Sequence, residues 1–212
     1  MVDNPPSELQ RLIDGGDAAL AELFSEYRER LERIVTFRLD PRIRGRFDSS
    51  DVLQEAYIEI ARRFSEYIDA PSVSFFIWLR QRTLQTMIDL HREHFREKRD
   101  PDRENRYLAQ PTSQATSMSI ARFLIGDVTS PSQAAIEAEE TQRLHAALDS
   151  MQEIDREVLA LRHFEHLSNL QVAEILNLSP TAASNRYIRA AARLSEIVAS
   201  LHPSMVRKDV RK

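Results

Sequence analysis

The 212-residue chain contains no cysteine, which excludes both a disulfide framework and a thiolate metal site. It has only four glycines, and long segments lack proline, so helices are favoured over a turn-rich sheet protein. No apolar run approaches the roughly 18 residues of a membrane span, and residues 1–7 do not resemble a signal peptide. These absences predict a soluble, cytoplasmic, all-α protein with no membrane partner.

The overall charge is mildly acidic, with a net charge of −4 and an isoelectric point near 5.9. A protein that coats nucleic acid non-specifically would have a basic surface throughout, so the composition argues against that class. Any contact with DNA must therefore come from local basic patches. The acidic remainder of the surface is available to a basic partner.

The segment from Ser168 onward carries the signals of two short helices joined by a tight turn. Ser168 and Gln171 form the Ser-x-x-Gln pattern of a capping box, which starts a helix. Asn177 tolerates the left-handed conformation that ends one. Ser179 followed by Pro180 then provides a cap and a favourable first helical position. This order predicts a helix-turn-helix motif.

The second helix of this motif has an apolar side and a cationic side. The cationic side gathers Ala182, Asn185, Arg186, Arg189 and Arg193 at helical spacing. Arg and Asn are the residue types that bind guanine and adenine bidentately in the major groove. An isolated helix of this composition would more often have a merely solvated face, but the preceding capped helix and turn favour DNA binding.

Apolar residues at helical spacing predict three long helices in the first half, at residues 17–39, 51 to about 67, and 75 to about 98. Prolines with clustered Ser, Thr, Gln and Ala then indicate a linker, which contains one short apolar group at 120–125. The predicted organisation is an N-terminal extension (1–16), a helical domain (17–100), the linker (101–133), a second helical domain (134–202) and a basic tail (203–212).

The third predicted helix has a polar stripe that ends in a basic cluster. The stripe and its extension contain Gln81, Arg82, Gln85, Asp89, Arg92, Arg96, Lys98 and Arg99. Such a stripe suits a nucleic-acid backbone, although cations near a helix C-terminus are also favoured by the helix dipole. Trp78 lies on the polar side, where its ring either stacks on a base or closes the rim of the core.

The second predicted helix has an outward strip that differs in character from the stripe of the third. It contains Asp51, Gln54, Glu55, Ile58 and Arg62, with the acidic groups in the N-terminal half. Carboxylates near a helix N-terminus are favoured by the helix dipole alone. An exposed Ile within a polar strip is instead typical of a protein contact.

Several segments, in order and at their spacings, resemble a bacterial RNA polymerase sigma factor of the extracytoplasmic-function (ECF) type, in the sigma-70 family. The matching segments are 51–57, Trp78-Leu79 with Asp89 following, 156–159, 162–164, 172–176 and 190–194. The resemblance covers residues 17 to about 201. It implies a region 2-like first domain, a region 4-like last domain and no third domain between them.

The resemblance also implies partners and sites. Asp51, Gln54, Glu55 and Ile58 would contact the β′ clamp of core RNA polymerase, and the β flap would be a second polymerase contact. Residues Trp78, Arg82, Gln85, Asp89, Arg92, Arg96, Lys98 and Arg99 would hold the melted minus-ten element, with an extruded base against the loop at 67–74. Residues Thr181, Ala182, Asn185, Arg186, Arg189 and Arg193 would contact the minus-thirty-five element.

Promoter melting in this class is binding work, so no catalytic residue, metal or cofactor is expected. The resemblance allows an anti-sigma factor as a further partner. Three other classes stay open from the residues alone. One is a helix-turn-helix regulator that acts without polymerase, and another is a helical adaptor with only protein partners. The third is a metalloenzyme built on His91 and His94 or on His163 and His166, although the zinc-protease spacing is absent.

Overall fold

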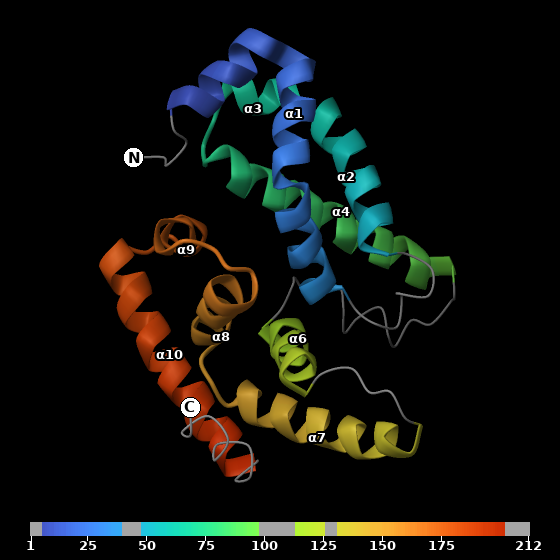
Figure 1. The fold of residues 1–212 in the computed structure, drawn as a ribbon, viewed down its shortest axis with the longest axis vertical. Coiled ribbons are helices and arrows are strands. Elements are labelled where there is room, and N and C mark those ends of the chain that lie inside the picture. Colours follow the sequence, from blue (N-terminus) through green and yellow to red (C-terminus); the bar gives the residue numbers. More distant parts are fainter. Residues whose placement is uncertain (1–5, 40–47, 98–112, 126–130, 202–212) are drawn as a thin grey trace, which may run out of the picture. The chain divides into compact units, whose positions relative to one another are not determined.

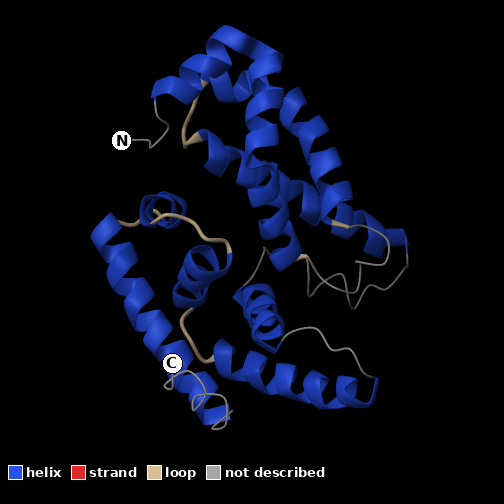
Figure 2. Ribbon diagram, viewed as in Figure 1, coloured by secondary structure: helices blue, strands red, loops and turns tan. Residues whose placement is uncertain are grey.

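The computed structural model describes residues 6–39, 48–97, 113–125 and 131–201. Within these ranges every regular element is a helix, joined by turns and short loops (Figures 1 and 2). The chain divides into two compact units, Met1–Gln110 and Pro111–Lys212. None of the helices in the described ranges combines the length and the apolar character needed to cross a bilayer. The predicted all-α class is confirmed.

The first unit contains α1 (Pro6–Arg38), α2 (Ser49–Arg62), α3 (Phe64–Asp69) and α4 (Phe75–Glu97). Helix α4 packs against both α1 and α2 (Figure 1). The fully buried side chains of this unit include Leu20, Leu23, Leu31, Ile34, Leu53, Ile60, Phe75, Ile77 and Leu79. Apolar side chains from three helices therefore form one core, as the periodicity predicted.

Helix α1 bends sharply at Gly16, whose φ of 54° lies in the left-handed region that glycine tolerates. The segment before the bend was predicted to be an N-terminal extension outside the domain. Instead, its described residues form a helical arm of the first unit with Leu12 buried, and the Tyr27 hydroxyl donates a hydrogen bond to the Glu8 carboxylate. Burial of the Tyr27 hydroxyl raises its pKa, and the hydrogen bond to Glu8 raises this pKa further.

The predicted helix at 51–67 is two helices. It begins with a capping box in which the Asp51 amide donates to Asp48 Oδ1 (2.9 Å) and the Asp48 amide donates to Asp51 Oδ2 (3.0 Å). The helical path is interrupted at Arg63, whose amide is shared between the Glu59 and Ile60 carbonyls. Helix α3 starts at the next residue, with Phe64 buried.

The second unit contains α6 (Ser113–Ile125), α7 (Pro131–Asp149), α8 (Glu153–Leu159), the π-helical turn η1 (Ala160–Phe164), α9 (Asn169–Leu176) and α10 (Pro180–Leu201). Part of the predicted linker therefore belongs to this unit, because α6 packs against α7, α8 and η1. Ile120 and Ala121 are fully buried. Two polar contacts add to this packing: the Thr116 hydroxyl donates to Glu157 (2.9 Å), and the Ser117 hydroxyl donates to Asp149 (2.8 Å).

The predicted helix-turn-helix is confirmed at α9 and α10. The Gln171 amide donates to Ser168 Oγ (3.2 Å), while the Ser168 amide donates to Gln171 Oε1 (3.1 Å). Asn177 has φ 51° and ψ 48°, the left-handed conformation expected at the end of a helix. Helix α10 starts at Pro180, where the Ala182 amide donates to Ser179 Oγ (3.1 Å).

The left-handed turn gives a stability prediction at Asn177. Replacing Asn177 with Ala should lower the free energy of unfolding by about 1 kcal/mol, because a Cβ without a local hydrogen-bonding group disfavours this conformation. Replacing it with Gly should leave stability unchanged or slightly higher. Urea unfolding followed by circular dichroism measures both variants, and an Ala variant as stable as the Gly variant would contradict the assignment.

Candidate polymerase and nucleic-acid interfaces

The predicted polymerase-binding strip is present on the outer side of α2. Asp51, Gln54 and Glu55 are exposed, and Ile58 is 44% exposed despite its apolar side chain. Val52, Leu53 and Ala56 are buried on the opposite side, which fixes the rotation of the helix. The Asp51 carboxylate also accepts the capping hydrogen bond of its own helix, so part of its role is structural.

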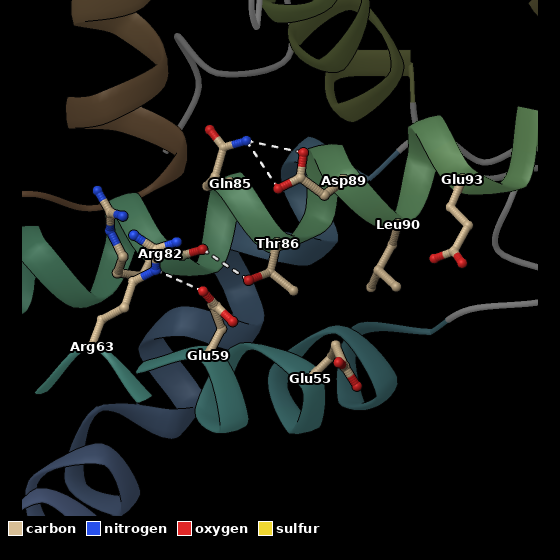
Figure 3. Close-up of a pocket in the computed structure, with 9 residues that line it drawn as sticks. All are labelled: Glu55, Glu59, Arg63, Arg82, Gln85, Thr86, Asp89, Leu90 and Glu93. Carbon is tan, nitrogen blue, oxygen red and sulfur yellow. Dashed lines mark hydrogen bonds and ion pairs between the residues drawn. The ribbon is translucent and has the colours of Figure 1, made fainter. Parts of the chain in front are cut away.

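A groove of about 300 Å³ lies between α2 and α4 (Figure 3). It is lined by Glu55, Glu59, Arg63, Arg82, Gln85, Thr86, Asp89, Leu90 and Glu93. The structure therefore brings Glu55, which was assigned to the polymerase, together with Arg82, Gln85 and Asp89, which were assigned to DNA. Four carboxylates and two guanidinium groups line this groove, so its excess charge is negative and repels phosphate.

Ion pairs occupy part of this groove. The Arg63 guanidinium donates to Glu59 at 2.6 Å, and this hydrogen bond lowers the pKa of the Glu59 carboxyl. Arg82 is half-buried, and its Nε has no hydrogen-bond partner among the described residues. Arg82 was predicted to lie on the exposed DNA-binding stripe, but its side chain is half-buried and lines the groove.

The remaining polar stripe of α4 is exposed and internally bonded. Gln85 donates to both carboxylate oxygens of Asp89 at 3.1 Å, and Arg92 lies 3.4 Å from the same carboxylate (Figure 3 shows the first pair). Among the basic positions predicted to follow, Arg96 lies in α4 with a side chain outside the described set, and Lys98 and Arg99 lie outside the described residues. Among the described side chains of this stripe, Arg92 is therefore the cation that is exposed.

Trp78 belongs to the core. Its ring lies 4.8 Å from that of Tyr67 and 6.0 Å from that of Phe75, and the residue is only 8% exposed. The interpretation that its ring stacks on a base is therefore replaced by the alternative, a rim residue of the core. The Tyr67 hydroxyl donates to the Val73 carbonyl (3.2 Å), so the same aromatic cluster anchors the loop before α4.

The cationic side of α10 is exposed as predicted, except at Arg186. Thr181, Ala182, Asn185, Arg189 and Arg193 are exposed. The opposite side carries the buried residues Ala183, Ala190 and Ile197. Arg193 makes a surface ion pair with Glu196 (3.0 Å), which a phosphate can readily displace.

The difference is Arg186, which is only half-exposed and bonded to α8. Its Nη1 donates to Asp155 Oδ1 at 2.6 Å and to Gln152 Oε1 at 3.2 Å. The sequence did not suggest either partner, because Gln152 and Asp155 precede Arg186 by 34 and 31 residues. Only the packing of α10 against α8 brings them together.

Arg156 has a structural role that its place in the sequence did not indicate. It is 5% exposed, and its Nη1 donates to the carbonyls of Leu148 (3.1 Å), Asp149 (3.1 Å) and Met151 (2.7 Å). These carbonyls belong to the C-terminal end of α7 and the turn after it, where helical partners are missing. Arg156 therefore caps α7 and fixes the start of α8 beside it.

The histidines considered for a metal site are dispersed. His163 and His166 are exposed, and the His94 side chain lies outside the described set. Across the ranges that the structure describes, no three His, Asp or Glu side chains gather as metal ligands would.

Several known proteins and one family model are similar to this chain in sequence or structure. Residues 6–198 match the family model described as ECF sigma factor. The chain is 30% identical over 144 residues to the probable RNA polymerase sigma factor RfaY of Xanthomonas campestris pv. campestris, which covers 68% of this chain and 32% of that protein. The chain thus spans about a third of the length of this relative. Among solved structures, that of CnrH in complex with the cytosolic domain of CnrY matches at a TM-score of 0.49 and 20% identity, covering 91% of this chain and 96% of that one.

Proposed function

This chain belongs to the ECF sigma factor family, and from that premise we propose that it binds core RNA polymerase and directs it to promoters as a non-catalytic subunit. The single observation that carries the proposal is the confirmed helix-turn-helix whose exposed face is cationic in an otherwise acidic protein. A local cationic face on a chain of net charge −4 is suited to one defined stretch of DNA.

In this proposal the first unit holds the polymerase through the outer strip of α2. The strip combines carboxylates with the exposed Ile58, and four carboxylates line the adjoining groove, one of which is Glu55 of the strip itself. Such a surface complements a basic partner with an apolar contact at its centre. The proposed partner is the β′ clamp of the polymerase, with the β flap as the second contact. An anti-sigma factor that covers the same surfaces is a further proposed partner.

The minus-ten element would lie along the basic end of α4. Arg92 is exposed there, and the predicted cations Arg96, Lys98 and Arg99 follow in the sequence. The segment at 67–74, which comprises the end of α3 and the loop after it and is anchored by the hydrogen bond from Tyr67 to the Val73 carbonyl, would receive an extruded base. Because Arg82 and Asp89 line an acidic groove, they are assigned to the polymerase side of this unit rather than to DNA.

Charge reversal at Glu55 tests the polymerase contact. The Glu55→Lys variant should bind core polymerase about tenfold or more weakly, because one attractive charge becomes repulsive at an interface of opposite charge. Fluorescence titration of the labelled full chain with purified core enzyme measures the dissociation constant. The loss should shrink as salt is raised, since exposed charges are screened.

The matched control is Glu29→Lys, the same charge reversal at an exposed position of α1. It should bind core polymerase within about twofold of the unmodified protein, since it lies outside the strip. Equal weakening by both variants would show that net charge, not the α2 strip, governs binding. No weakening by Glu55→Lys would remove the strip from the proposal.

A further inference from the structure

Arg186 is held through one nitrogen and leaves one edge of its guanidinium open. The Nη1 atom donates to Asp155 and to Gln152, and a primary guanidinium nitrogen carries two hydrogens, so both are used. The Nη2 and Nε hydrogens have no partner among the described residues. The Nε hydrogen and one Nη2 hydrogen lie on a single edge of the planar group, in the fork geometry that binds two acceptors side by side.

Guanine presents such a pair of acceptors, O6 and N7, in the major groove. We propose that Asp155 and Gln152 position Arg186 so that its open edge reads one guanine of the upstream promoter element. This inference rests on the proposed function, in which α10 enters the major groove. In it, Asp155 and Gln152 are positioning residues, because they act through Arg186.

The contact between Arg186 and Asp155 is better explained as holding Arg186 ready for DNA than as holding it away from DNA. The Arg186 and Asp155 side chains are 25% and 22% exposed, so the pair is partly shielded and its geometry is restricted. A long side chain that is ordered before binding loses less conformational entropy when it meets the base. A carboxylate near DNA also repels phosphates, which lowers affinity for every sequence equally. The arrangement therefore favours the correct base at the expense of general affinity.

Removal of the Asp155 carboxylate should lower the preference for guanine and raise the affinity for non-specific DNA, and both quantities can be measured together. The Asp155→Ala variant should reduce the preference for the guanine by about tenfold, which is within the range for one bidentate contact. The same variant should bind a duplex of scrambled sequence severalfold more tightly, because a negative charge has been removed. Gln152→Ala should weaken the guanine preference without tightening scrambled-sequence binding, since no charge changes.

The experiment uses holoenzyme reconstituted from the full chain and bacterial core RNA polymerase. Holoenzyme selects from a pool of duplexes randomised at the upstream element, and sequencing gives the base preference at each position. A fixed scrambled duplex measures non-specific affinity in parallel. Arg186→Ala should lose one guanine preference, and adding Asp155→Ala to that variant should change the base preferences no further.

The matched control is Glu153→Ala, which removes one charge from an exposed side chain in the same turn of α8. It should tighten scrambled-sequence binding but keep the guanine preference. If Asp155→Ala keeps the preference as Glu153→Ala does, the positioning role is overturned while the DNA-reading function of α10 stands. If Arg186→Ala, Asn185→Ala and Arg189→Ala all leave every base preference unchanged, the proposed function of α10 itself fails.

Discussion

Replacing both Arg186 and Arg189 with Ala is expected to abolish promoter-specific initiation while leaving binding to core polymerase intact. The side chains are three residues apart on the cationic side of α10, and Arg189 is exposed. A lost base contact costs about 1–3 kcal/mol and a lost phosphate contact weakens binding to all sequences, so two losses together reduce occupancy by roughly a hundredfold or more. In-vitro transcription from a promoter dependent on this protein measures the outcome.

The control for this variant is the pair Ser195→Ala and Ser184→Ala, two changes at exposed positions of the same helix that remove no charge. Initiation with this control should stay within about twofold of the unmodified protein, because exposed Ser to Ala changes have small effects. Core binding measured by fluorescence titration should be equal for all three proteins. Unchanged promoter use by the double Arg variant would refute the assignment of α10 to DNA.

Replacing Arg156 with Met is expected to have the largest effect on stability. The side chain is nearly fully buried and donates to three carbonyls at the end of α7. Met fills a similar volume but donates nothing, so the three carbonyls lose the donor that Arg156 supplies, although the Leu148 carbonyl keeps the hydrogen bond from the Met151 amide (2.9 Å). The expected loss is about 3 kcal/mol, in line with removal of one partner from a buried charged network.

Urea unfolding of the full chain, followed by circular dichroism, measures this loss as an earlier transition of the second unit. Arg156→Lys keeps the positive charge and a donor nitrogen but changes its position, because the ammonium of Lys ends a different stem from the Nη1 atom that makes all three hydrogen bonds. It should recover only part of the lost stability. Full stability of the Met variant would show that the three carbonyls are satisfied in another way, and would contradict the capping role.

Local signals made the helix-turn-helix predictable. The capping box of Ser168 and Gln171, the left-handed Asn177 and the start at Pro180 each depend on residues close in sequence. The same holds for the helical periodicity that placed the core of α1. Where a structural feature depends on residues that are close in sequence, residue types and spacings were sufficient to predict it.

Tertiary packing decided the features that the sequence did not predict. Trp78 has polar neighbours on its helix, but the ring of Tyr67 from another helix covers it. Arg186 has the spacing of an exposed residue, yet its partner Asp155 lies 31 positions earlier. The helix α6 was interpreted as linker because its Ser and Thr residues are typical of one, whereas Thr116 and Ser117 are buried donors to carboxylates. Such contacts between distant residues leave no periodic signal.

We propose that this chain opens promoters only together with core RNA polymerase. Permanganate footprinting on a library of genomic promoter fragments, with the full chain alone, core enzyme alone and both together, tests it most directly. Reactive thymines in the minus-ten region are expected only when both are present. Specific protection of duplex DNA by the chain alone, with no opening when core enzyme is added, would instead indicate a regulator that acts without polymerase.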